Sequence, residues 1–237
     1  MPGTPAMPDS QGGSRLYLRQ LEVGPMQNFV YLIGDREKRE AVVVDAAWDI
    51  DGIVKVAEHD DMRITAGLVT HFHPDHLGGA MMGMEIQGAA ELLAKLPVKI
   101  HIHKTEAPYA KKIAGLADSD MVLDDAGDTL RVGDLDVRFL HTPGHTPGSQ
   151  CFLVDGNLVS GDTLFIGACG RVDLPGSSPE DLYHSLNNTL KRLPSETVLY
   201  PGHNYASRTT STIGDEARTN PYMRFDRLDE FLRIMGY

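Results

Sequence analysis

The stretch Thr70-His71-Phe72-His73-Pro74-Asp75-His76 decides how the rest of the sequence is interpreted. It places three imidazoles and one carboxylate within six residues, directly after the run Ile64 to Thr70, which predicts a strand. Imidazole and carboxylate groups together are typical ligands of zinc, iron or manganese. Alternate residues of an extended segment share one side, so His71 and His73 are expected to face one metal. The turn that follows lets Asp75 and His76 reach a second position, and the sequence therefore predicts a metal site here.

Composition is that of an ordinary folded protein. With 237 residues, 41% of them hydrophobic and 23% charged, the chain is long enough for one sizeable α/β domain. The formal net charge of −11 disfavours a nucleic-acid partner, because an acidic surface repels phosphate groups. Apolar runs are too short to span a membrane, so no membrane partner is expected. Two cysteines make no disulfide framework, which favours a cytoplasmic location, and residues 1–14 are expected to form a disordered tail rich in Pro, Gly and Ser.

Hydrophobic patterning predicts two β-rich halves, each followed by helices, and hence two packed sheets with helices outside. Between Gly78 and Leu96 the Met, Ala and Leu content predicts helical stretches interrupted by Gly83 and Gly88. The remaining strands are expected at Tyr17–Val23, Phe29–Ile33, Ala41–Asp45, Val98–His103, Thr129–Arg131, Leu135–His141, Ser149–Val154, Leu158–Ser160 and Thr197–Tyr200. The remaining helices are expected at Ile50–His59, Glu106–Leu116, Pro179–Arg192 and Tyr222–Ile234.

Three later segments complete a pattern with the histidine cluster. They are Thr142-Pro143-Gly144-His145-Thr146-Pro147-Gly148, Ser160-Gly161-Asp162-Thr163 and Tyr200-Pro201-Gly202-His203-Asn204-Tyr205. In this order they resemble the motifs of the metallo-β-lactamase superfamily, from about Leu16 to Gly236. The resemblance implies an α/β fold, a four-layer αββα sandwich, formed by a single domain over residues 15–237.

The resemblance also implies a role for each matching position. His71, His73 and His145 would hold one metal, Asp75, His76 and His203 a second, and Asp162 would bridge the two. Asp75 and Asp162 are thereby the expected catalytic carboxylates. Asp45, which closes an apolar strand, resembles the acid beneath the family's site and would orient the ligand loop; ordinary turn chemistry at a strand end is the equal alternative.

Two divalent ions, zinc before iron or manganese, imply hydrolysis of a small thioester or ester by attack of a metal-bridging hydroxide. Within the superfamily the sequence looks closest to the glyoxalase II and persulfide dioxygenase branch. Arg171, after Cys169-Gly170, fills the position at which glyoxalase II relatives contact glutathione; a surface arginine is the alternative. The chain departs from glyoxalase II in its short region after His203 and in the Met-rich stretch Gly79 to Leu96.

The main alternative is a persulfide dioxygenase that oxidises glutathione persulfide with a single iron at His71, His145 and Asp162. Gly170-Arg171-Val172-Asp173, Leu182-Tyr183-His184-Ser185 and Ile234-Met235-Gly236 resemble that group. Pro201-Gly202-His203 and Leu174-Pro175-Gly176 favour the hydrolase. A lactonase and a non-catalytic metal-binding sensor are weaker alternatives. The expected partner is a small thioester, ester or glutathione-derived molecule, and a homodimer is compatible with the sequence.

The other histidines are expected to have structural roles. His101 and His103, in a strand followed by Lys104, are predicted to be exposed. His141 lies beside the ligand loop but matches no ligand position, and His184 is expected to pack or make a polar contact on its helix.

Overall fold

In the computed structural model, which describes residues 15–237, two neighbouring strands send alternate side chains into two different cores. In β2 (Asn28–Asp35), Val30 and Leu32 face one core while Phe29, Tyr31 and Ile33 face the other. In β3 (Glu40–Val44) the alternation continues, with Val43 on the first side and Val42 and Val44 on the second. A sheet that is apolar on both faces must be covered on both, so a layered sandwich follows.

The first sheet has six strands in the order β1-β2-β3-β4-β7-β8. Its strands beyond β2 and β3 are β1 (Leu16–Val23), β4 (Arg63–Leu68), β7 (Ile100–His103) and β8 (Met121–Asp124). Strands β3, β4, β7 and β8 run parallel, so their carboxyl ends meet at one edge of the sheet.

The second sheet also has six strands, in the order β16-β15-β12-β11-β10-β9. They are β9 (Thr129–Val132), β10 (Leu135–His141), β11 (Gln150–Val154), β12 (Asn157–Gly161), β15 (Val198–Pro201) and β16 (Ser211–Thr212). β12 and β15 are parallel neighbours, and the loops that follow them therefore begin side by side.

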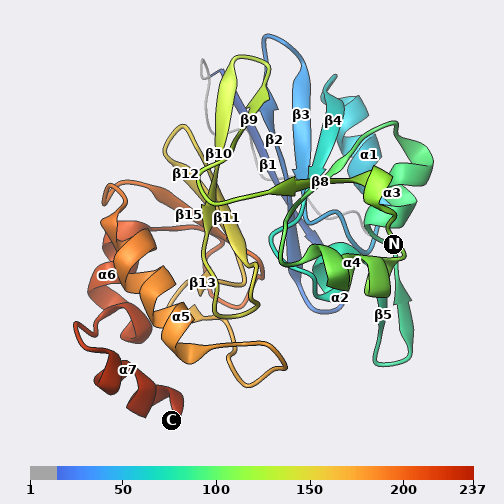
Figure 1. Cartoon of the computed structure of the whole chain (residues 1–237). Helices are drawn as coiled ribbons and strands as arrows, with labels where there is room; N and C mark the ends of the chain where they lie inside the picture. Colours follow the sequence, from blue (N-terminus) through green and yellow to red (C-terminus); the bar gives the residue numbers. More distant parts are fainter. Residues whose placement is uncertain (1–14) are drawn as a thin grey trace.

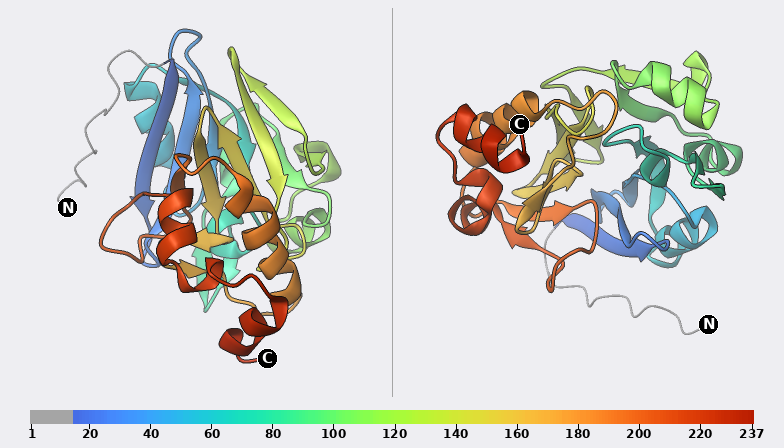
Figure 2. Two further views of the ribbon diagram at one scale, coloured as in Figure 1. Left: turned by 90° about the vertical axis from the view of Figure 1, so that its left-hand side faces the viewer. Right: turned by 90° about the horizontal axis from the view of Figure 1, so that it is seen from below.

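Helices cover the outer face of each sheet, as the view from below shows (Figure 2). On the first sheet lie α1 (Ile50–His59), α2 (Pro74–Leu77), α3 (Ala89–Lys95) and α4 (Ala107–Ala114). On the second lie α5 (Pro179–His184), continued by helical turns to Arg192, then α6 (Ile213–Thr219), a 3₁₀ turn at Pro221–Met223, and α7 (Leu228–Met235). The arrangement confirms the predicted αββα sandwich (Figure 1).

The stretch after the histidine cluster differs from the prediction. Instead of helices from Gly78 onward, β5 (Gly79–Met81) and β6 (Met84–Ile86) form a small antiparallel hairpin, and only α3 is helical. Met82 and Gly83 at its tip both have positive φ, of 52° and 78°, which turns the chain back on itself instead of continuing a helix. The Met82 side chain is 89% exposed, so this methionine does not pack in the core.

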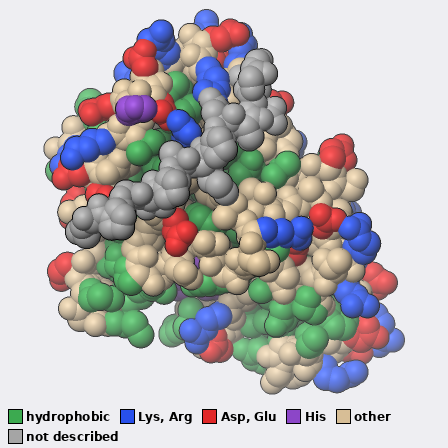
Figure 3. All heavy atoms as spheres, turned by 180° about the vertical axis from the view of Figure 1, so that it is seen from behind, with side chains coloured by type: hydrophobic (Ala, Val, Ile, Leu, Met, Phe, Trp, Pro, Cys, Tyr) green, Lys and Arg blue, Asp and Glu red, His purple; other side chains and the backbone are tan. Residues whose placement is uncertain are grey.

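Several smaller features complete the description. A second short hairpin joins β13 (Leu164–Phe165) to β14 (Ala168–Cys169). On the face shown in Figure 3, cationic and anionic side chains are interspersed. None of the helices within residues 15–237 is long and apolar enough to cross a membrane. The predicted tail lies outside the described residues, and the division into tail and single domain stays a prediction.

The core between the two sheets should dominate stability. Phe139 on β10 is 1% exposed and meets Phe152 on β11 edge to face, with ring centroids 5.1 Å apart. Phe139→Ala is therefore expected to lower the free energy of unfolding by about 3–5 kcal/mol, measured by urea denaturation. Leu123→Ala on β8, where the side chain is 54% exposed, is the control and should cost about 0.5 kcal/mol or less. Equal losses in the two variants would contradict this account of the core.

Candidate metal centre

All seven residues that the motifs singled out come together at one end of the two sheets. Each follows a strand: the histidine cluster follows β4, His145 lies in the loop between β10 and β11, Asp162 follows β12, and His203 follows β15. Their side chains form three overlapping groups in which the ligand atoms lie within 4.8 Å of one another: His71, His73 and His145; His71, His76 and Asp162; Asp75, His76 and His203. The structure thus brings together donors from both sheets.

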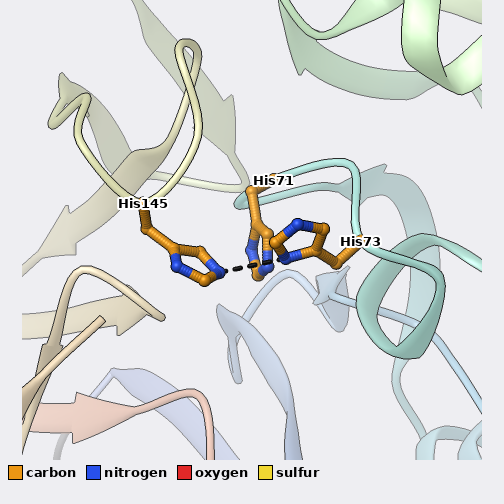
Figure 4. A group of neighbouring side chains, drawn as sticks. All are labelled: His71, His73 and His145. Atoms are coloured by element: carbon orange, nitrogen blue, oxygen red, sulfur yellow. Dashed lines mark hydrogen bonds between the residues drawn. The ribbon is translucent and has the colours of Figure 1, made fainter. Parts of the chain in front are cut away.

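His71, His73 and His145 form the first donor set (Figure 4). Nε2 of His145 lies 3.0 Å from Nδ1 of His73, and the three rings are packed with centroids 4.7–4.8 Å apart. His71 and His73 reach the same point because the segment is still extended at these positions, and Pro74 then starts α2. The first set therefore offers three ring nitrogens to one point in space.

Asp75, His76 and His203 form the second donor set. Nε2 of His76 lies 3.2 Å from Nε2 of His203 and 3.3 Å from Oδ2 of Asp75. Asp162 lies between the two sets, because its carboxylate oxygens are 3.3 Å from His76, 3.4 Å from His203 and 3.7 Å from His145. A Cβ on Gly202 would lie 2.4 Å from the nearer Asp162 oxygen, so glycine leaves the room that this carboxylate occupies.

Two buried polar atoms in this centre have no hydrogen-bond partner among the described residues: Nε2 of His71 and Oδ1 of Asp162. A buried polar atom without a partner is costly, and a cation would satisfy both atoms at once. Ring nitrogens and carboxylates are the ligands that zinc, iron and manganese take in proteins. The chemistry of the donors and their closeness therefore fit divalent metal ions.

The protonation states of His73 and Asp162 suit metal binding as well. Burial, together with His145 and His76, lowers the pKa of His73 to about 4, so its imidazole is neutral at neutral pH. Burial would raise the pKa of Asp162, but His76 and His203 hold that pKa well below the usual range of a carboxyl group. Metal ligands must be neutral imidazoles and ionised carboxylates, and His73 and Asp162 already meet that requirement. Burial would lower the pKa of His76, but Asp75 and Asp162 raise it well above the usual range of an imidazole, so a metal ion at the second donor set has to displace a proton from His76.

The second ring nitrogen of each of three histidines is held by an oxygen acceptor. His145 Nδ1 lies 2.9 Å from the carbonyl of Arg171, and His203 Nδ1 lies 2.9 Å from that of Met26. His76 Nδ1 lies 2.9 Å from Oδ2 of Asp45. An N–H that donates to oxygen fixes the tautomer and leaves Nε2 free for a metal.

Asp45 supports two ligands at once. It accepts hydrogen bonds from the backbone N–H of Thr70 at 2.7 Å and from its hydroxyl at 2.6 Å, and that hydroxyl is 3.0 Å from Nδ1 of His71. It therefore orders His71 through Thr70 and contacts His76 directly. Its φ of +54° is rarely adopted by residues other than glycine, and such backbone conformations cluster at functional sites. These contacts support the predicted role of Asp45 in orienting the ligand loop, which stays a prediction.

Sequence reasoning missed Glu106, a carboxylate that connects the two ligand loops. Glu106 is fully buried; its Oε2 accepts the backbone N–H of Phe72 at 2.7 Å and its Oε1 that of Gly148 at 2.6 Å. Phe72 lies between His71 and His73, and Gly148 closes the loop of His145. Glu106 precedes a helix, where acidic residues are common, so the sequence carried no signal for this role.

Arg171 is placed beside the centre, but its side chain is not directed into it by any contact. The guanidinium is 68% exposed and pairs with Asp173 at 2.8 Å, while the backbone carbonyl of Arg171 receives the hydrogen bond from His145. Contact between Arg171 and substrate stays a prediction.

The prediction that His101 and His103 are exposed is wrong. His103 is 2% exposed and stacks on His141 with ring centroids 4.0 Å apart; His101 bonds Asp124 at 2.9 Å. Both rings face the second sheet, where His101 meets Phe139 and His103 stacks on His141, both of β10; in addition β8, a strand that the patterning did not predict, pairs with β7 so that β7 is not an edge strand. His184 makes the polar contact expected of it, with Asn188 at 2.9 Å.

An αββα sandwich that gathers seven His and Asp donors at one end defines a class of metal-binding proteins. The family profile of the metallo-beta-lactamase superfamily matches residues 23–203, and the chain belongs to that superfamily. Members of this superfamily bind divalent metals, and this chain has the donors to do so.

Three similar proteins are informative. The chain is 30% identical to the mitochondrial persulfide dioxygenase ETHE1 of Homo sapiens, over 94% of this chain and 82% of that protein. It is 31% identical to the hydroxyacylglutathione hydrolase GloC of Haemophilus influenzae, over 86% of this chain and 96% of that protein. The crystal structure of ETHE1 from Myxococcus xanthus superposes with a TM-score of 0.79 at 31% identity, covering 93% of this chain and 90% of that one.

The pKa of Glu106 gives a pH-dependent prediction. Burial raises it to about 7 from an ordinary value of 4.5, against the lowering effect of the Gly148 and Phe72 N–H groups. The folded state therefore retains a proton that the unfolded state loses, and this stabilisation, complete below pH 4.5, disappears as the pH rises to about 7. Glu106→Gln cannot titrate, so the variant should be more destabilised at pH 5 than at pH 8, by about 2–3 kcal/mol.

Urea unfolding of both chelator-treated proteins at the two pH values measures this difference, because all other groups titrate alike in each. A deficit that is constant, or larger at pH 8, would show that Glu106 is ionised throughout.

Proposed function

We propose that the protein is a dinuclear metal-dependent hydrolase that cleaves a small thioester or ester. The observation that carries the proposal is the position of Asp162, whose carboxylate lies within 3.7 Å of ring nitrogens from both donor sets. His71, His73 and His145 would hold one divalent ion and Asp75, His76 and His203 the other, with Asp162 shared. Zinc is the metal that we propose first, since three histidines at one site and two histidines with an aspartate at the other suit it.

Two divalent ions, when bound, supply a nucleophile from water at neutral pH and a Lewis acid for the carbonyl oxygen. The residues of the chain have separate tasks. Asp162 and Asp75 are ionised: without metal, His76 and, for Asp162, also His203 keep the pKa of these carboxyl groups low although burial opposes this, and a bound cation would favour the same ionised state. They would face the reacting water and accept its hydrogen bonds. Asp45 and Glu106 keep the ligand loops in place, so that no reorganisation is required during the reaction.

The substrate class is proposed from the relatives. One is named as a hydroxyacylglutathione hydrolase and another as a persulfide dioxygenase, and both names point to small sulfur-containing substrates. A glutathione-derived thioester is accordingly our first choice. Arg171 is proposed to contact its carboxylates after the pairing with Asp173 opens. A cytoplasmic location and a homodimer remain further proposals.

A second candidate is a persulfide dioxygenase with one iron. The similarity to ETHE1 proteins extends over 93–94% of this chain, compared with 86% for the hydrolase GloC. His71, His145 and Asp162 would then supply two imidazoles and one carboxylate, the set used by non-haem iron oxygenases.

Metal analysis of the purified protein followed by two assays on the same sample separates these candidates. Two zinc ions per chain with cleavage of a hydroxyacyl-glutathione thioester would support the hydrolase. One iron per chain with oxygen uptake on glutathione persulfide would overturn it in favour of the dioxygenase.

His203→Ala tests the assignment of the second donor set. Loss of this ligand should release one of the two ions and lower the hydrolytic rate by at least about 100-fold, because a metal supplies several kcal/mol to the transition state. His184→Ala, on α5 and outside the donor groups, is the control and should retain both ions and the full rate. A His203→Ala protein with two ions and full activity would exclude His203 as a ligand.

A further inference from the structure

Asn28 is a buried amide that contacts the second donor set. It is 1% exposed, and its Nδ2 donates to Oδ2 of Asp75 at 3.0 Å and to the Asp75 carbonyl at 3.1 Å. Its Nδ2 also lies 3.4 Å from Nε2 of His76, and its backbone forms a bridge with His203, so Asn28 contacts all three residues of that set. Among residues 15–237, Asn28 is the side chain outside the donor groups that donates a hydrogen bond to the Asp75 carboxylate.

Trp48 determines which way this amide points. Its indole Nε1 lies 3.0 Å from Oδ1 of Asn28. An indole nitrogen can only donate, so the amide oxygen must face Trp48 and the amide nitrogen must face Asp75. Without the indole N–H the amide is free to turn, and its oxygen would then oppose the Asp75 carboxylate.

The backbone around Trp48 is built to hold the ring in this place. Trp48 has a φ of +70°, an uncommon conformation for a bulky residue, and its backbone N–H donates to the carbonyl of Gln87 at 2.9 Å. The ring packs on Gly24, where an added Cβ would lie 2.4 Å from the nearest indole carbon. Asp45, the other supporting residue, stands three positions earlier in the same loop and also has positive φ. Strain of this kind persists where the surroundings enforce it, often at functional sites.

We propose that Trp48 and Asn28 act as a positioning relay that holds the Asp75 carboxylate ready for the second metal ion. The inference rests on the proposed two-metal function and adds residues to it. Asp75 lies in α2, a helix of four residues that gives its side chain little support of its own. The relay supplies that support from β2 and from the loop after β3. Neither residue touches the substrate; both act through Asp75.

Zinc titration of the chelator-treated full chain, in competition with a chromophoric chelator, measures the affinity of each site. Asn28→Ala should weaken the second zinc by about 10–100-fold, the range found when residues supporting a ligand are removed. Trp48→Phe keeps a ring but loses the N–H, and should weaken the same ion by about three- to tenfold. The first zinc should change by less than about threefold in either variant.

The double variant distinguishes a relay from a general loss of structure. Trp48 acts only through Asn28, so Trp48→Phe with Asn28→Ala should be no worse than Asn28→Ala alone. Tyr17→Phe is the matched control: it removes a ring donor to a carboxylate, Asp60 at 2.7 Å, at the opposite end of the first sheet, and should leave both affinities unchanged. Trp48 is the one tryptophan of the chain, so its fluorescence in the wild type should change with the second zinc equivalent and not with the first.

Three outcomes would each overturn the relay. They are an equal loss of affinity for both zinc ions, additive effects of Asn28→Ala and Trp48→Phe in the double variant, and unchanged affinities in the single variants. If the wild type binds a single ion, the dinuclear function fails on its own. The relay is then supported if Asn28→Ala still lowers the affinity for that ion and adding Trp48→Phe lowers it no further. It is excluded if either result is not obtained. Should Asn28→Ala fail to fold, Trp48→Phe and the fluorescence of the wild type decide the matter.

Discussion

The rest of this structure has to accommodate a cluster of histidine and aspartate side chains at one end of the two sheets, where these groups are desolvated and the imidazoles repel one another. Five histidines and two aspartates meet there, all buried except the half-buried His73 and Asp162. They form three overlapping groups with ligand atoms within 4.8 Å of one another in each group, and two of their polar atoms have no partner among the described residues. Such a cluster is unfavourable in an apolar interior unless a cation joins it. The fold makes it by stacking two sheets so that the loops after β4, β10, β12 and β15 meet at one edge.

The surroundings of the cluster are as specific as its members. Asp45 contacts His76 and, through Thr70, His71; Glu106 joins the loops of the first donor set; Asn28 holds Asp75. Each of these three side chains is buried, and each accepts or donates hydrogen bonds to a different part of the centre. Ligand orientation is therefore fixed from outside, which keeps the imidazoles in one tautomer and the carboxylates in one rotamer. A metal site arranged in this way loses little entropy when an ion binds.

The two β-rich halves of the sequence predicted two packed sheets with helices outside, and the resemblance to the motifs of the superfamily implied the αββα sandwich and the seven converging side chains. β2 and β3 are nearly continuous apolar runs, as expected of strands buried on both faces, and the four ligand motifs are short and follow strands. Patterning failed at β8, a four-residue edge strand with little alternation. The exposure of His101 and His103 was also predicted wrongly, because their rings are covered by β10 of the other sheet. Patterning failed again at the hairpin β5–β6, where two positive φ values outweigh the helical propensity of Met and Ala. Glu106, Asn28 and Trp48 act through contacts between residues distant in sequence, which one sequence cannot reveal.

The central claim is that the two donor sets hold two metal ions. Anomalous diffraction at the zinc and iron absorption edges, from crystals of protein purified without added metal, tests it most directly. The account predicts two peaks, one bounded by His71, His73 and His145 and the other by Asp75, His76 and His203, with Asp162 between them. A single peak, or peaks away from these side chains, would contradict it.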